Sequence, residues 1–142
     1  MTATTATAAP INNQGAPVAP IFPLSIVLPD AGPDAKFVGI IISACGKKRE
    51  AIFLLPGDSN DANWQAQMDW AASIGGELPD RVEGALLFAI MPDEFKSDWY
   101  WTREQRADDS GFAWVQDFGV GGQDWLSKSN GCRARAVRRL PI

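Results

Sequence analysis

The 142-residue sequence contains no histidine. Without imidazole, the chain can hold neither a Ser-His-Asp or Cys-His catalytic group nor a zinc site that needs histidine ligands. Cysteine is almost as scarce, since Cys45 and Cys132 are the only two and stand far apart. Two cysteines do not make a disulfide framework. Although they could pair if their strands met, we expect two free, buried thiols.

Long hydrophobic runs are also missing. No apolar stretch approaches the roughly 20 residues that a membrane-spanning helix needs. The N-terminus lacks the basic start and apolar core of a secretory signal. We therefore expect no membrane insertion, and synthesis in a cytoplasm.

Positive charge is in the minority, with 13 Lys and Arg against 17 Asp and Glu, a net charge of −4. Nucleic acids and anionic membranes both need a basic footprint, so we expect neither as a partner. Four arginines near the end of the chain are a local exception. We expect them at the surface, stacked on tryptophans or paired with acidic residues, with a phosphate or sulfate site as the alternative: Arg133, Arg135, Arg138 and Arg139.

Charge is absent altogether from residues 1–20, which are mainly threonine, alanine, proline and asparagine. Such a segment cannot bury enough apolar surface to fold alone. We expect an extended arm with polyproline character near Pro10, Pro17 and Pro20. The remaining residues, 21–142, are enough for one domain with its own core.

Strand patterns open this domain. Apolar residues alternate at Phe22, Leu24, Ile26 and Leu28, which predicts a first strand. A second strand is expected over 37–44 and a third over 50–55, joined by a turn at 46–48.

Two helices are expected next. Ser59, Asn60 or Asp61 can cap the first, which Gly75-Gly76 ends. Asp80 and Glu83 have capping-box spacing and begin the second, which Pro92 ends. The helical period predicts two buried stripes: Trp64, Met68, Ala71 and Ala72 on the first helix, and Val82, Ala85, Leu86 and Ala89 on the second.

Three short runs follow, at 98–102, 111–118 and 133–139, separated by polar, glycine-rich loops. Four of the six tryptophans lie between positions 99 and 125. We expect Trp99, Trp101 and Trp114 to belong to the core and the arginine run to form the closing strand. The order of strands, helices and strands predicts an α+β domain with two helices packed on small antiparallel sheets.

Several of these segments resemble one family. The helical half and the C-terminal half of the domain both resemble small phage and prophage proteins. The matching segments are 64–71, 75–79 and 83–87 in the helical half, and 99–102, 113–114, 121–122 and 133–138 in the C-terminal half. Those proteins carry a C-type-lectin-like domain of the kind shared with formylglycine-generating enzymes. The resemblance covers about residues 36 to 140 and excludes the arm.

The resemblance implies a C-type-lectin-like fold used for display. In related phage receptor-binding proteins, the last two strands and their connecting loop form the ligand face. Tryptophan and phenylalanine would supply rigid contact area there, and the polar residues adaptable hydrogen bonds. Carried over by position, the ligand-binding residues would be Asp117, Phe118, Gln123, Asp124, Trp125 and Ser127.

Three kinds of chemistry are rejected. The formylglycine-generating branch needs a pair of reactive cysteines, and Cys45 and Cys132 have no partner nearby in sequence. Residues 58–63 are rich in oxygen but lack the glycine and distal glutamate of an EF-hand loop, so we expect a helix cap and no calcium or other metal. No carboxylate pair stands in an apolar setting that would suit sugar hydrolysis. We expect no catalytic residue and no cofactor.

Two functions remain. The first is a non-enzymatic bacteriophage virion protein, such as a tail-fibre component, whose lectin-like domain binds a host glycan or surface protein. The second is an architectural accessory or decoration protein of a capsid or tail. Both need an anchor, and we expect residues 1–20 to bind other virion proteins. We also expect a homo-oligomer.

Overall fold

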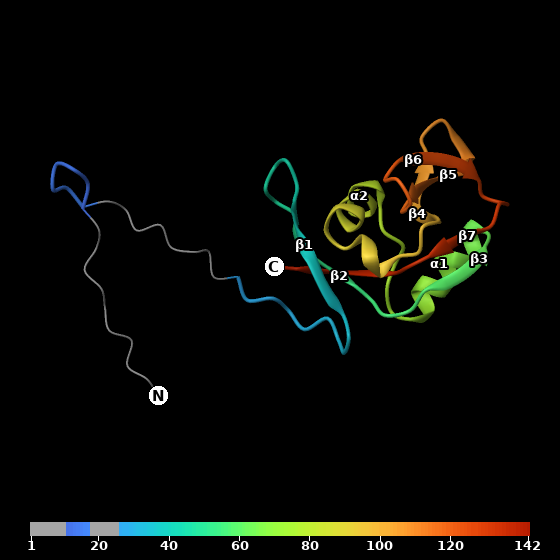
Figure 1. The fold of residues 1–142 in the computed structure, drawn as a ribbon, viewed down its shortest axis with the longest axis horizontal. Coiled ribbons are helices and arrows are strands. Elements are labelled where there is room, and N and C mark those ends of the chain that lie inside the picture. The colour runs from blue at the N-terminus through green and yellow to red at the C-terminus, as the bar shows by residue number, and fades with distance from the viewer. Residues whose placement is uncertain (1–10, 18–25) are drawn as a thin grey trace.

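The computed structural model describes residues 11–17 and 26–142. The described residues form two small sheets and two helices (Figure 1), which confirms the predicted α+β class. None of the helices in this part of the chain is long and apolar enough to cross a membrane.

The first sheet joins the beginning of the domain to its end. Strands β1 (Lys36–Ile42) and β2 (Arg49–Leu54) form the expected hairpin, and β8 (Val137–Pro141) pairs antiparallel with β2. The order is β1-β2-β8, so β1 is an edge strand. A bulge at Val38 interrupts its regular pairing with β2.

The second sheet has the order β3-β7-β4-β5-β6. Its strands are β3 (Ser59–Ala62), β4 (Trp99–Arg106), β5 (Asp109–Asp117), β6 (Gln123–Ser127) and β7 (Cys132–Ala134). All neighbours are antiparallel except β4 and β7. The arginine run is therefore not one closing strand: β7 ends in this sheet, and after two intervening residues β8 begins in the other.

Helix α1 (Trp64–Ser73) covers one face of the second sheet. Its N-cap is Asn63, whose side chain accepts from the amide of Ala66 at 2.9 Å, because the expected cap residues 59–61 form β3 instead. Trp64 and Ala71 pack against Trp101, Ala113 and Val115 in one buried cluster. Gly76 follows the helix and lies close to β8. A Cβ added at this position would come 2.8 Å from the carbonyl oxygen of Val137, so only glycine fits.

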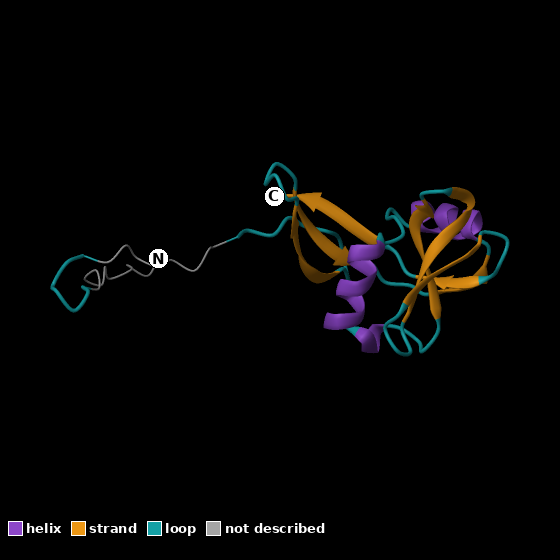
Figure 2. Ribbon diagram, turned by 90° about the horizontal axis from the view of Figure 1, so that it is seen from above, coloured by secondary structure: helices purple, strands orange, loops and turns teal. Residues whose placement is uncertain are grey.

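Helix α2 (Arg81–Ile90) lies between the two sheets (Figure 2). The predicted capping box is present, with Asp80 and Glu83 bonded reciprocally. The predicted buried stripe is wrong: Glu83, Gly84 and Leu87 are buried, whereas Val82 is 63% exposed. The helix is apolar on most sides, so periodicity alone could not choose the face. A short 3-10 turn, η1 (Pro92–Glu94), follows α2.

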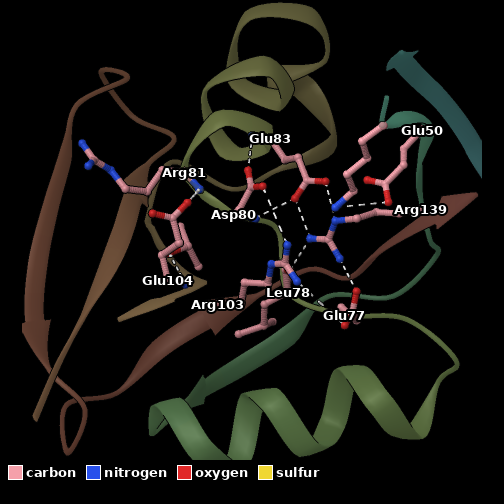
Figure 3. A network of polar contacts seen from close by, with 11 residues as sticks. Glu50, Glu77, Leu78, Asp80, Arg81, Glu83, Arg103, Glu104 and Arg139 are labelled. Carbon is pink, nitrogen blue, oxygen red and sulfur yellow. Dashed lines mark hydrogen bonds and ion pairs between the residues drawn. The ribbon is translucent and has the colours of Figure 1, made fainter. Parts of the chain in front are cut away.

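Buried arginines connect the C-terminal segment to the rest of the domain. Arg139 donates to both carboxylate oxygens of Glu83, at 2.6 and 2.5 Å, and also to Glu77 (Figure 3). Arg135 donates to the carbonyl oxygens of Leu55 and Glu94. These arginines were expected at the surface. Their pairing with acidic residues is confirmed, but as part of the interior.

The N-terminal region is described only in part. Residues 11–17 form a tight turn rather than an extended chain, since the Asn12 side chain accepts from the amides of Gln14 and Ala16. Two predicted features lie largely outside the described residues. They are the rest of the arm, at 1–10 and 18–20, and residues 22–25 of the strand predicted at 22–28. Residues 26–28 do not form a strand, and their side chains are exposed, that of Val27 by 88%.

Candidate functional site

One face of β4, β5 and β6 carries arginines and tryptophans in a row. Trp114 stands opposite Trp125 on the neighbouring strand, and their rings meet edge to face with centroids 5.0 Å apart. The guanidinium of Arg81 lies 3.6 Å from the Trp114 ring centroid, and that of Arg106 lies 4.3 Å from the Trp125 centroid. We call these four residues the cation–aromatic row. Arginine stacking fixes both indoles and covers part of each ring.

The alternation of β5 explains why Trp114 faces away from the core. Ala113 and Val115 point into the buried cluster under α1, so Trp114 between them must point to the opposite face. We expected Trp114 in the core, and it is instead half-buried within the row. Trp125 is 38% exposed, so its ring is available to a ligand.

Gln123 positions the first arginine of the row. Its amide nitrogen donates to the Arg81 carbonyl oxygen at 2.7 Å and to the Gln116 side chain at 2.8 Å. Its side-chain oxygen accepts from Nε of Arg81 at 3.1 Å. Among the described residues, the terminal nitrogens of this guanidinium make no hydrogen bond and no ion pair, so they are available for a ligand.

A shallow pocket of about 420 Å³ opens beside the row. The Glu104 carboxylate accepts from the amide of Arg81 at 2.9 Å, next to this opening. The pocket thus combines a cation, an acceptor and apolar surface, which suits a polyhydroxylated ligand. Its lining residues are Arg81, Val82, Ala85, Glu104 and Gln123.

The residues carried over from the resemblance divide between the two faces of the sheet. Gln123, Trp125 and Ser127 share the face of the row, because they alternate along β6. Asp117 and Asp124 lie on the opposite face, opposite Trp99 and Val115 in register. The Asp117 side chain accepts from the amide of Gly119 at 2.7 Å and helps close the β5–β6 turn.

Phe118 belongs to neither face. It is 5% exposed and stacks on Phe95 with ring centroids 3.8 Å apart, while Tyr100 meets it edge to face. The side chain belongs to the buried cluster that joins α2, the first sheet and Tyr100 of β4, so it is not accessible to a ligand. Because Phe118 comes just after β5, we expected it in an exposed loop, whereas its side chain points into the core.

The opposite face carries a second exposed tryptophan. Trp99 was expected in the core, yet it is 36% exposed, although Trp101 is fully buried on the same side of β4. Trp99 starts the strand and lies beyond the cluster that α1 covers, beside a small opening of about 170 Å³ with Asp124. Trp99 and Trp125, which are exposed to a similar extent, thus lie on opposite faces of the second sheet.

Sequence reasoning missed Arg81 and Arg106 as members of the row, and Glu104 as part of the pocket beside it. Strict two-residue alternation from Ala113 to Val115 could have placed Trp114 on the face of the row. No local pattern could have identified Arg81, because it comes from a helix 33 residues earlier in the chain. Only the packing of α2 against β5 brings it there.

Both cysteines are free, but they differ in environment. Cys132 is buried, as expected, and burial raises the pKa of its thiol to about 12. Cys45 is exposed in the β1–β2 turn, contrary to expectation, and a hydrogen bond from Ser43 lowers its pKa. Within residues 11–17 and 26–142, no three Cys, Asp or Glu side chains are grouped to hold a metal ion.

No protein-family model matches the chain, and no curated protein matches it in sequence.

Proposed function

We propose that this protein is a non-enzymatic binding protein of a bacteriophage particle whose C-type-lectin-like domain binds a glycan on the host surface. The observation that supports binding is the cation–aromatic row beside a pocket with both donors and acceptors. Two helices packed on small sheets agree with the fold that the resemblance implies. The site includes three of the residues carried over from it: Gln123, Trp125 and Ser127.

The physical argument for a glycan rests on two kinds of surface in one place. A sugar ring has an apolar face that packs against an indole, which Trp125 presents at 38% exposure. Its hydroxyl groups need fixed donors and acceptors, which Arg81 and Glu104 supply in the pocket beside the row. The hydrogen bonds of Gln123 hold Arg81 before the ligand arrives, so little side-chain ordering remains to be done on binding.

Trp125→Ala tests this proposal, and Trp99→Ala is its matched control. Both changes remove a tryptophan of nearly equal exposure, 38% and 36%, but from opposite faces of one sheet. We expect Trp125→Ala to weaken adsorption of the purified chain to host cells or their isolated polysaccharide by roughly 30-fold, the loss typical of a binding hot spot of about 2 kcal/mol. Trp99→Ala should adsorb normally.

Two results would overturn the placement of the ligand site, and a third would overturn the proposed function. Normal adsorption by Trp125→Ala would remove the row from the ligand face. Loss confined to Trp99→Ala would move the site to the face of Asp117 and Asp124. If purified wild-type chain adsorbs to no host material while particles still require it for assembly, the architectural function is the better proposal.

A further inference from the structure

The free edge of the first sheet is apolar, and no strand among the described residues pairs with it. Beyond the bulge at Val38, β1 continues regularly from Gly39 to Ile42. Apolar side chains surround this edge, with Phe37 43% and Ile42 57% exposed. Ile90 of α2, 51% exposed, lies one helical turn beyond Leu86, which contacts Gly39. An exposed apolar edge strand is a template for pairing with another strand.

We propose that residues 22–28 of a second copy of this chain add to this edge as a further strand. The segment Phe22-Pro23-Leu24-Ser25-Ile26-Val27-Leu28 alternates apolar residues at even positions. Its described part, 26–28, is exposed and makes no hydrogen bond to another described residue. Strand addition would satisfy the backbone of both segments and cover the apolar side chains around β1. This inference goes beyond the glycan-binding proposal and does not depend on it.

Proline at position 23 fits this role. In a strand, backbone groups of alternate residues point to opposite sides, so residues 22, 24, 26 and 28 can all bond to β1 while Pro23 points outward. Its missing N–H then lies on the new outer edge, where no donor is needed. The added strand would therefore end the sheet instead of recruiting another one.

The charge around β1 favours this segment over direct pairing of two β1 strands. Lys36 begins the strand, and Lys47, Lys48 and Arg49 follow its end. An antiparallel β1–β1 pair would place the first cation of one copy near the last three of the other, where Glu50 and Glu94 only partly offset them. Residues 1–29 carry no charge, so the segment meets no such repulsion.

The path of the chain favours a second copy over the chain's own segment. Ala31 packs on Ala51 and Phe53 of β2, and its carbonyl oxygen accepts from Arg138 of β8, the edge opposite β1. Asp30 accepts from the amide of Gly32 at 2.9 Å, which turns the chain there. From Ala31, Leu28 would have to pass β1 itself, about two strand spacings or roughly 10 Å away, with the connecting residues almost fully extended. In this structure residues 26–28 of the same chain pair with no strand.

Light scattering of the full chain tests the proposal, with one variant on each side of the interface. Leu24→Asp/Ile26→Asp breaks the donated segment, and Ala6→Asp/Ala8→Asp is its control with the same charge and spacing. Ile42→Lys blocks the edge, and Val120→Lys, at an 82% exposed site elsewhere, is its control. We expect wild type and both controls to form an oligomer, and both interface variants to be monomeric.

Mixing the two interface variants gives the decisive result. One has an intact edge and the other an intact segment, so we expect a 1:1 complex through one remaining pair. A wild-type monomer at every concentration would overturn the proposal. An oligomer that Ile42→Lys breaks but Leu24→Asp/Ile26→Asp preserves would instead establish direct β1–β1 pairing.

Discussion

Two groups of arginines in this protein have different surroundings. Arg133, Arg135 and Arg139 are buried or nearly so and meet carboxylates and carbonyl oxygens of distant segments. Arg81 and Arg106 lie on an open sheet face and stack on tryptophans. The same side chain thus stabilises the fold where its donors are enclosed, and keeps some donors open to solvent on the sheet face.

The largest effect on stability should come from removing Glu83, the partner of the buried Arg139. Glu83→Ala leaves the Arg139 guanidinium buried without its bidentate partner and also removes half of the capping box. We expect the free energy of unfolding, measured by urea denaturation, to fall by roughly 3–5 kcal/mol. Asp80→Ala, which removes only the cap side chain, should cost about 1 kcal/mol. A similar loss in both variants would contradict the importance of the buried ion pair.

Arginine-to-lysine changes compare the two groups directly. Lysine cannot reproduce two hydrogen bonds of a planar guanidinium, so Arg135→Lys should lose its contacts to Leu55 and Glu94 and destabilise the fold by about 2 kcal/mol. Arg81→Lys loses stacking on Trp114 at the surface and should cost less than about 1 kcal/mol. Urea denaturation checks both values, and a larger loss for Arg81→Lys would show that the row is part of the stabilising framework.

The two thiols extend the contrast between enclosed and open surroundings. Cys132 has its pKa raised from 9.0 to about 12, so below pH 9 the thiol is neutral in both folded and unfolded chains. Above pH 9 the unfolded chain ionises first, and this group should lower stability by about 1.4 kcal/mol for each pH unit until about pH 12. The difference in unfolding free energy between wild type and Cys132→Ala, measured from pH 8 to pH 10, reports this slope.

Thiol labelling is the control for that measurement. Cys45 is exposed and should react quickly with a disulfide reagent at pH 8, whereas Cys132 should react only when the chain unfolds. Fast reaction of both thiols in the native protein would show that the core around Cys132 opens readily. The predicted slope in stability should then be absent.

The sequence predicted the local features of the fold well. The β1–β2 hairpin, both helices and the capping box of α2 appear at or near their expected residues, because short-range patterns specify them. The candidate site was predicted less completely. Trp125, Gln123 and Ser127 share one face. Phe118 is buried because the chain turns inward after β5, and Asp117 and Asp124 face the other way because side chains alternate along β5 and β6.

The composition alone decided that histidine chemistry is absent, that residues 1–29 carry no charge, and that aromatic residues concentrate after position 98. Tertiary structure decided which side of α2 is buried, which arginines are enclosed, and that Arg81 stacks on Trp114. The physical reason is range. Caps, turns and alternation arise between residues a few positions apart, whereas Arg139 meets Glu83 across 56 positions and Arg81 meets Gln123 across 42, through packing that no local pattern records.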